Sequence, residues 1–256
     1  MNVLPLTAPT IACLAVSLHV FAGETIAPSV PEIAQAGYRL AWADEFSGDK
    51  LDVTKWAYRT DSKRASTQRP ENVALRGGIL RLELKKEAAN GKPYTGAGVI
   101  SKPAFKYGYY EARMKIPAGS GWHTSFWMQK HDNSGGTSPG ATCQEIDVCE
   151  NDSAKPWVYT VNLHQWISPH IQYGLKPVKA PDLSKDFHTF GCEFTPKTIR
   201  YFLDGAWVQT IDATWLKHGD QNIWLTSIGN KDGMDESKLP AAAEVDYVRF
   251  FEKTAN

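Results

Sequence analysis

Three carboxylate residues stand at spacings of two and three in the segment 145–150, which reads Glu-Ile-Asp-Val-Cys-Glu. Because the side chains of a β-strand alternate between its two faces, Glu145 and Asp147 share one face and the apolar residues beside them share the other. Strict alternation would place Glu150 on the apolar face. We therefore expect a β-bulge at Val148 and Cys149, which returns Glu150 to the face that carries the other two acids.

Three carboxyl groups in such a row cannot all ionise readily, so the pKa of at least one should be raised. A glycosidase needs one ionised and one protonated carboxyl group, because the carboxylate attacks and the carboxylic acid protonates the leaving oxygen. On a concave sheet the side chains of Glu145 and Glu150 lean together, which is compatible with the carboxyl separation of about 5–5.5 Å in retaining enzymes. The row therefore indicates cleavage of glycosidic bonds.

Short strand signals recur along the chain and must position this row. The segment 79–84 alternates leucine with charged residues, the segment 110–116 alternates in the same way, and Asp204-Gly205 between two apolar runs is typical of a two-residue hairpin. Many half-buried strands in 256 residues favour one large all-β domain built as a two-sheet sandwich.

The composition narrows the class of partner. Lys and Arg together number 28 and so do Asp and Glu, with no basic tract, which argues against nucleic acid. Nine tryptophans suit a polysaccharide partner, since indoles stack on the apolar faces of sugar rings, although most should pack in the core. The chain has neither H-E-x-x-H nor paired C-x-x-C, so we expect no cofactor for catalysis.

The N-terminal residues 1–22 are predicted to be an export signal, because the apolar run 11–22 precedes small residues at a plausible cleavage point. The run is shorter than the about 20 residues that a membrane span needs. No Lys or Arg precedes Arg39, so the signal is atypical or the start lies elsewhere. We expect a secreted or periplasmic monomer without a membrane anchor. Residues 23–37 would form a leader, loosely ordered or wrapped around the edge of a domain spanning 38–254.

Three cysteines would remain after removal of the signal, namely Cys143, Cys149 and Cys192. Their spacing fits no zinc site. We expect them to be small buried residues, with a disulfide between two of them as the alternative.

The carboxylate row and its flanking segments resemble the signature of glycoside hydrolase family 16, which includes laminarinases, lichenases, agarases, porphyranases and κ-carrageenases. The resemblance covers nearly the whole chain from residue 39 onward, through the segments 39–46, 107–117, 125–128, 188–190, 199–205 and 244–249. It implies a β-jelly roll of two antiparallel sheets, similar to concanavalin A, with a substrate cleft across the concave sheet.

The resemblance also implies roles for the acids. Glu145 would be the nucleophile of a retaining reaction, and Glu150 the general acid and then the base. Asp147 would hydrogen-bond Glu145 and help to keep Glu150 protonated before attack.

Five further residues match positions that line the cleft in this family or lie next to the acids. Trp122 and Trp127 would stack on sugars, with core packing as the alternative. His164 and Trp166 should lie on a neighbouring strand, where His164 could bond a sugar hydroxyl or Glu150, or be purely structural. Arg64 belongs to an early loop that often shapes distant subsites.

Many members of the family carry a structural calcium ion away from the catalytic residues. Glu45, Gly78 and Asp246 match the positions of its ligands, and carboxylate and carbonyl oxygens suit that ion. Asp246 could instead cap the end of a strand.

Two departures from the family pattern bear on the substrate. Many laminarinases read Trp-Pro-Ala before the second tryptophan, whereas this chain reads Gly-Trp-His-Thr-Ser-Phe-Trp at 121–127, and their usual Asn-Asn-Glu stretch is replaced in the loop 62–72. Both segments form subsites, so a red-algal galactan competes with β-1,3/1,4-glucan as the substrate. We expect a secreted, endo-acting, retaining β-glycosidase. The alternatives are a non-catalytic carbohydrate-binding jelly roll, which should have lost one acid, and a transglycosylase, which only product analysis separates.

Overall fold

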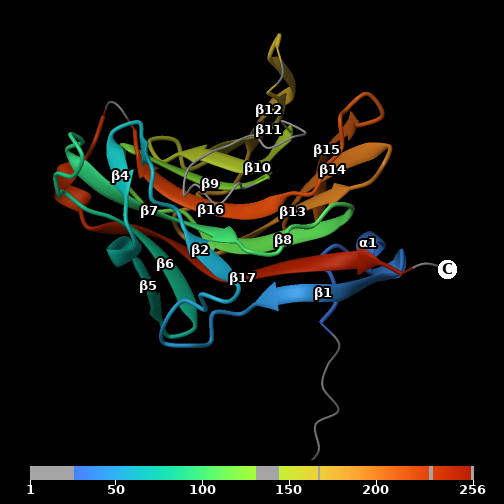
Figure 1. Cartoon of the computed structure of the whole chain (residues 1–256), viewed down its shortest axis with the longest axis horizontal. Coiled ribbons are helices and arrows are strands. Elements are labelled where there is room, and N and C mark those ends of the chain that lie inside the picture. The colour runs from blue at the N-terminus through green and yellow to red at the C-terminus, as the bar shows by residue number, and fades with distance from the viewer. Residues whose placement is uncertain (1–25, 131–143, 167, 231–232, 255–256) are drawn as a thin grey trace, which may run out of the picture.

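The computed structural model describes residues 26–130, 144–166, 168–230 and 233–254. Figure 1 shows two stacked layers of β-strands. One sheet has eight strands: β15 (Ala206–Asp212), β14 (Thr198–Leu203), β13 (His188–Phe194), β8 (Gly108–Lys115), β17 (Ala241–Lys253), β6 (Ile79–Leu84) and β5 (Val73–Arg76) in spatial order, with β1 (Tyr38–Asp44) paired to β17.

The other sheet has nine strands and carries the acids. Its spatial order is β12 (Ile171–Lys179), β11 (Val158–Gln165), β10 (Gln144–Asp152), β9 (Trp122–Gln129), β16 (Asn222–Gly229), β7 (Tyr94–Ser101), β4 (Ser66–Gln68) and β3 (Ser62–Lys63), with β2 (Trp56–Tyr58) paired to β7. In the described part of the chain the helices are one-turn elements: α1 (Pro31–Gln35), η1 (Pro70–Asn72) and η2 (Glu236–Lys238). The predicted all-β sandwich of two sheets is confirmed, although β4 runs parallel to β7.

The core lies between the sheets and follows the predicted alternation. On β6 the burial pattern alternates strictly, with Leu80, Leu82 and Leu84 fully buried. On β10, Ile146 and Val148 point into the same core. Burying one such side chain contributes about 1.5–3 kcal/mol, so the apolar face of β10 fixes which way its acids point.

The hairpin predicted at residues 204–205 joins β14 to β15. Asp204 has a φ of 49° and Gly205 a φ of 79°, which is the left-handed pair that a tight two-residue hairpin requires. Asp204 also accepts hydrogen bonds from the backbone of Thr189 and the ring of His188, which ties the hairpin to β13.

The leader packs on the outer face of the eight-stranded sheet. Val30 and Ile33 are buried there with Tyr109 and Phe202 among their neighbours. The backbone N–H of Ser29 donates a 2.9 Å hydrogen bond to the buried carboxylate of Glu111. Residues 26–37 therefore wrap the domain and are not loose, and the predicted export signal lies outside the described residues.

Two of the three predicted cysteines are buried free thiols, Cys149 and Cys192, as expected of small core residues. Cys143 lies outside the described residues. Among the helices of the described chain, none is long and apolar enough to cross a membrane.

Candidate active site

The predicted bulge in β10 is confirmed. Across β9, Asp147 pairs with Trp127 and Cys149 pairs with the next residue along, Phe126, so one residue of β10 has no partner. The pairing with β11 shifts between Asp147 and Glu150 as well. The extra residue turns Glu150 back to the face that carries the other two acids.

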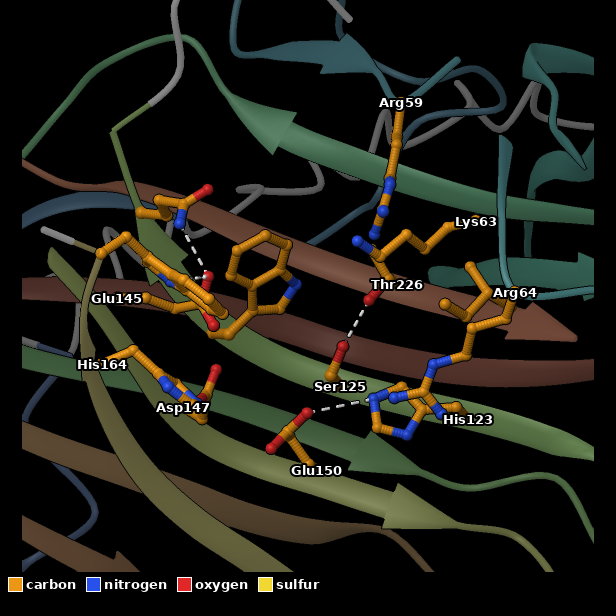
Figure 2. A pocket seen from close by; sticks show the side chains of 14 residues that line it. Arg59, Lys63, Arg64, His123, Ser125, Glu145, Asp147, Glu150, His164 and Thr226 are labelled. Atoms are coloured by element: carbon orange, nitrogen blue, oxygen red, sulfur yellow. Dashed lines mark hydrogen bonds and ion pairs between the residues drawn. The ribbon is translucent and has the colours of Figure 1, made fainter. Parts of the chain in front are cut away.

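The three acids line one pocket of about 400 Å³. Figure 2 shows the carboxylates on one side of this pocket and the cationic side chains of Arg59, Lys63 and Arg64 on the other. Four strands of the nine-stranded sheet and the turn between β3 and β4 supply most of the lining residues: Arg59, Lys63, Arg64, His123, Ser125, Trp127, Gln129, Glu145, Asp147, Glu150, His164, Trp166, Thr226 and Ile228.

Glu145 is held through one of its two oxygens. Its Oε2 accepts a 2.7 Å hydrogen bond from Gln129 and a 3.2 Å hydrogen bond from the indole of Trp166. No described residue donates a hydrogen bond to Oε1. Burial raises the pKa of Glu145 to about 7, against the opposing effect of the Trp166 hydrogen bond.

Asp147 is the most deeply buried of the three acids, with 3% of its surface exposed. Its Oδ2 has no hydrogen-bond partner among the described residues and lies 3.5 Å from Nε2 of His164. Burial, and then the charges of Glu150 and Glu145, raise the pKa of Asp147 well above its ordinary value. The described donors to Glu145 are Gln129 and Trp166, and the hydrogen bond expected between Asp147 and Glu145 stays a prediction.

The surroundings of Glu150 lower its pKa, whereas those of Glu145 and Asp147 raise theirs. Burial disfavours its charge, but the hydrogen bond and charge of His123, with Arg64 behind it, hold the pKa of Glu150 below its usual range. The Nε2 atom of His123 lies 3.2 Å from Oε1 of Glu150 (Figure 2). The three carboxyl groups interact electrostatically, so their titrations are coupled.

Trp127, His164, Trp166 and Arg64 lie on the pocket wall, where the sequence predicted them. Trp127 stacks on Trp224 with ring centroids 4.6 Å apart. Trp166 is 40% exposed and therefore offers a surface on which a sugar could stack.

His164 has a polar partner at each of its two ring nitrogens. Its Nε2 lies 2.7 Å from the amide of Asn162, and its Nδ1 lies 2.9 Å from Nε2 of His170. Burial, with the neighbouring His170, lowers the pKa of His164, which keeps the ring neutral beside the acids. One ligand atom each of Glu145, Asp147 and His164 lies within 4.8 Å of the others, so these three could also bind a metal ion.

The prediction that Trp122 stacks on sugar is wrong. Trp122 is fully buried, and its indole donates to the carbonyl of Pro117. The reason is the odd spacing: positions 122 and 127 on one strand point to opposite faces. The neighbour His123 takes the place in the pocket.

Seven lining residues escaped the sequence analysis: Arg59, Lys63, His123, Ser125, Gln129, Thr226 and Ile228. Alternation along β9, counted back and forward from Trp127, would have found three of them, His123, Ser125 and Gln129. Arg59 and Thr226 carry no local signal, because they reach the pocket through long-range strand pairing.

The residues predicted to hold calcium are engaged elsewhere. Both carboxylate oxygens of Glu45 bind Arg249, at 2.8 and 2.9 Å, and Asp246 binds Arg113 at 2.6 Å. Gly78 lies in the turn between β5 and β6. As arranged, the carboxylates do not fit a calcium site, because guanidinium groups occupy them. Calcium binding stays a prediction, which a loss of thermal stability on chelation would support.

The two-sheet sandwich with three acids on a bulged strand defines a glycoside hydrolase of the jelly-roll fold. The family model described as β-porphyranase A–D, GH16 domain, matches residues 40–252. The chain belongs to glycoside hydrolase family 16, whose members include endo-acting glycosidases.

Individual relatives act on different polysaccharides. The chain is 29% identical to a β-glucanase of Rhodothermus marinus over 244 residues, covering 84% of this chain and 85% of the relative. It is 30% identical to β-porphyranase E of Zobellia galactanivorans over 197 residues, covering 67% and 68%. The solved structure of SCLam, a non-specific endo-β-1,3(4)-glucanase, superposes with a TM-score of 0.75 at 27% identity, covering 90% of this chain and 95% of that one.

Proposed function

We propose that this protein is a retaining endo-hydrolase of a sulfated galactan, with Glu145 as nucleophile and Glu150 as acid and base. In the first step Oε1 of Glu145 attacks the anomeric carbon while Glu150 gives its proton to the leaving glycosidic oxygen. In the second step Glu150 takes a proton from water, whose oxygen displaces Glu145. The donors on Oε2 of Glu145 support this assignment, since they stabilise its charge without covering the attacking oxygen.

The proton must lie on Glu150 when the substrate is bound, whereas in the free site Glu150 is the acid whose pKa is lowered. Binding of the substrate itself moves the proton to Glu150. A glycosidic oxygen beside Glu150 accepts a hydrogen bond only from the protonated acid, and positive charge developing at the anomeric carbon favours ionised Glu145. Asp147, with its raised pKa, lies between them and can hold the shared proton until then.

The observation that carries the substrate class is the charge on the pocket wall opposite the acids. Arg59 is committed to Asp61 through two hydrogen bonds of 2.6 and 2.9 Å. Lys63 and Arg64 form no ion pair with a carboxylate among the described residues. A neutral glucan needs no such cations, whereas a sulfate ester binds well to them.

The turn between β3 and β4 positions Arg64. Arg64 and Ala65 form this two-residue turn, and Arg64 has the positive φ, 53°, that the first residue of such a hairpin turn adopts. A 2.5 Å hydrogen bond from Arg64 to Asn230 holds the side chain at the pocket.

The test is release of reducing ends from porphyran, κ-carrageenan, agarose, laminarin and lichenan, with Glu145→Gln as the inactive control. We expect oligosaccharides from a sulfated galactan and none from the control. Activity confined to laminarin or lichenan would contradict the substrate class. That outcome is the second candidate function, which the similarity to the β-glucanase of Rhodothermus marinus favours.

We also propose that the protein is exported and acts as a monomer outside the cytoplasm. A polysaccharide is too large to enter a cell intact, and the segment 1–22 has the composition of an export signal. Transglycosylation would use the same intermediate, so the products of the same digestion should be checked for chains longer than the substrate.

A further inference from the structure

His123 reaches the pocket because of its place on β9. It lies on the same face as Ser125 and Trp127, and it pairs across the sheet with Asp152, two residues beyond Glu150. Because side chains alternate along a strand, the odd-numbered positions of β9 face the pocket, and the neighbouring Trp122 faces away from it.

The contact is with Glu150. Nε2 of His123 lies 3.2 Å from Oε1 of Glu150, with 12% of the histidine side chain and 26% of the glutamate side chain exposed. No other described residue hydrogen-bonds this carboxyl group. The remaining charged or titratable groups that face it are Arg64 from the β3–β4 turn, His164 from β11, and Asp147 and Glu145 from β10 itself.

We propose that His123 is a positioning residue for the acid and base Glu150. Its Nε2–H holds Oε1, so Oε2 is the oxygen that gives the proton to the glycosidic oxygen and later takes one from water. His123 keeps its own proton through both steps. This inference rests on the proposed function, because it requires Glu150 to be the proton donor.

The contact has opposite effects on the two steps. A donor to Oε1 favours the ionised carboxylate, which assists the step in which Glu150 is a base and opposes the step in which it is an acid. The lowered pKa of Glu150 agrees with this direction. Removing the donor should therefore raise the pKa of Glu150 and loosen its orientation at the same time.

The first test needs no substrate. Glutamate labelled with ¹³C at the carboxyl carbon is titrated by NMR in the wild type, His123→Leu and His123→Gln, and the Glu150 signal is identified by its loss in Glu150→Gln. We expect the midpoint in His123→Leu to rise by about one pH unit, with a smaller rise in His123→Gln, which keeps an N–H donor at similar reach. An unchanged midpoint in His123→Leu would overturn the proposal.

The second test is kinetic. On the polymer, kcat of His123→Leu should fall about tenfold to hundredfold with KM nearly unchanged, and His123→Gln should recover most of the loss. On an activated aryl glycoside, whose leaving group needs no proton, kcat/KM should show little loss, because it reports only the first step. A raised KM with unchanged kcat would make His123 a sugar-binding residue and overturn the proposal. If the wild type cleaves no polymer, the proposed function fails, but the NMR titration still decides the role of His123.

Discussion

The indole of Trp166 should control the ionisation of Glu145, the proposed nucleophile. Its 3.2 Å hydrogen bond to Oε2 of Glu145 opposes the burial that raises the pKa of that carboxyl group to about 7. Trp166→Phe removes the N–H and keeps an aromatic ring beside His164 and His170. The substitution therefore separates the hydrogen bond from the stacking surface.

The magnitude follows from the geometry. A hydrogen bond to a charged group contributes about 1.5–3 kcal/mol when buried. Trp166 is 40% exposed and the bond is 3.2 Å long, so a value of about 1 kcal/mol is appropriate here. At about 1.4 kcal/mol per unit, the pKa of Glu145 should rise by about 0.7 units in Trp166→Phe.

The assay is kcat/KM of wild type and Trp166→Phe between pH 5 and 9. Less Glu145 is ionised below its raised pKa, so below pH 7 kcat/KM of the variant should be about fivefold lower than that of the wild type, and the two should converge towards pH 9, where the carboxylate is ionised in both proteins. Trp157→Phe is the matched control, because Trp157 is exposed and does not line the pocket. A loss of the same size at every pH would refute the reasoning and leave Trp166 as a stacking surface only.

Three further predictions follow from the described contacts. Lys63→Ala and Arg64→Ala should each raise KM about tenfold on a sulfated polymer and leave KM on the desulfated polymer unchanged. Arg69→Ala is the control, because Arg69 lies outside the pocket. Equal effects on both polymers would exclude sulfate binding. Ile33→Ala should cost about 3 kcal/mol and lower Tm by about 6–12 °C without changing kcat, whereas an unchanged Tm would show that the leader contributes no stability. Burial raises the pKa of Glu145 from 4.5 to about 7, so the folded state is destabilised as pH rises through this window. Glu145→Gln should therefore exceed the wild type in stability by up to about 3 kcal/mol at pH 8 and by little at pH 4, as followed by thermal melts; a difference independent of pH would contradict the burial argument.

The acid row could be predicted from the sequence because its information is local. Alternation fixes Glu145 and Asp147 on one face, and the distance to Glu150 requires an extra residue, which β10 has. The same rule, applied along β9, would have placed His123 in the pocket and Trp122 in the core. That error came from giving the family pattern more weight than the strand period.

Other parts of the site depend on pairings that no local pattern encodes. Lys63 and Arg64 reach the acids only because β4 pairs in parallel with β7 and β3 extends that edge of the sheet. Thr226 comes from β16, about a hundred residues further along the chain than β9, with which it pairs. The leader likewise packs on the eight-stranded sheet through a few apolar contacts, which its short sequence does not predict.

The central claim is that Glu145 forms a covalent intermediate that Glu150 helps to hydrolyse. Time-resolved ¹H NMR of the first oligosaccharides released from the preferred β-linked polymer tests it most directly, because the anomeric signal is read before mutarotation. The account predicts that the β-anomer appears first and the α-anomer grows in later. An α-anomer appearing first would show direct displacement by water and contradict the assignment of Glu145 as nucleophile.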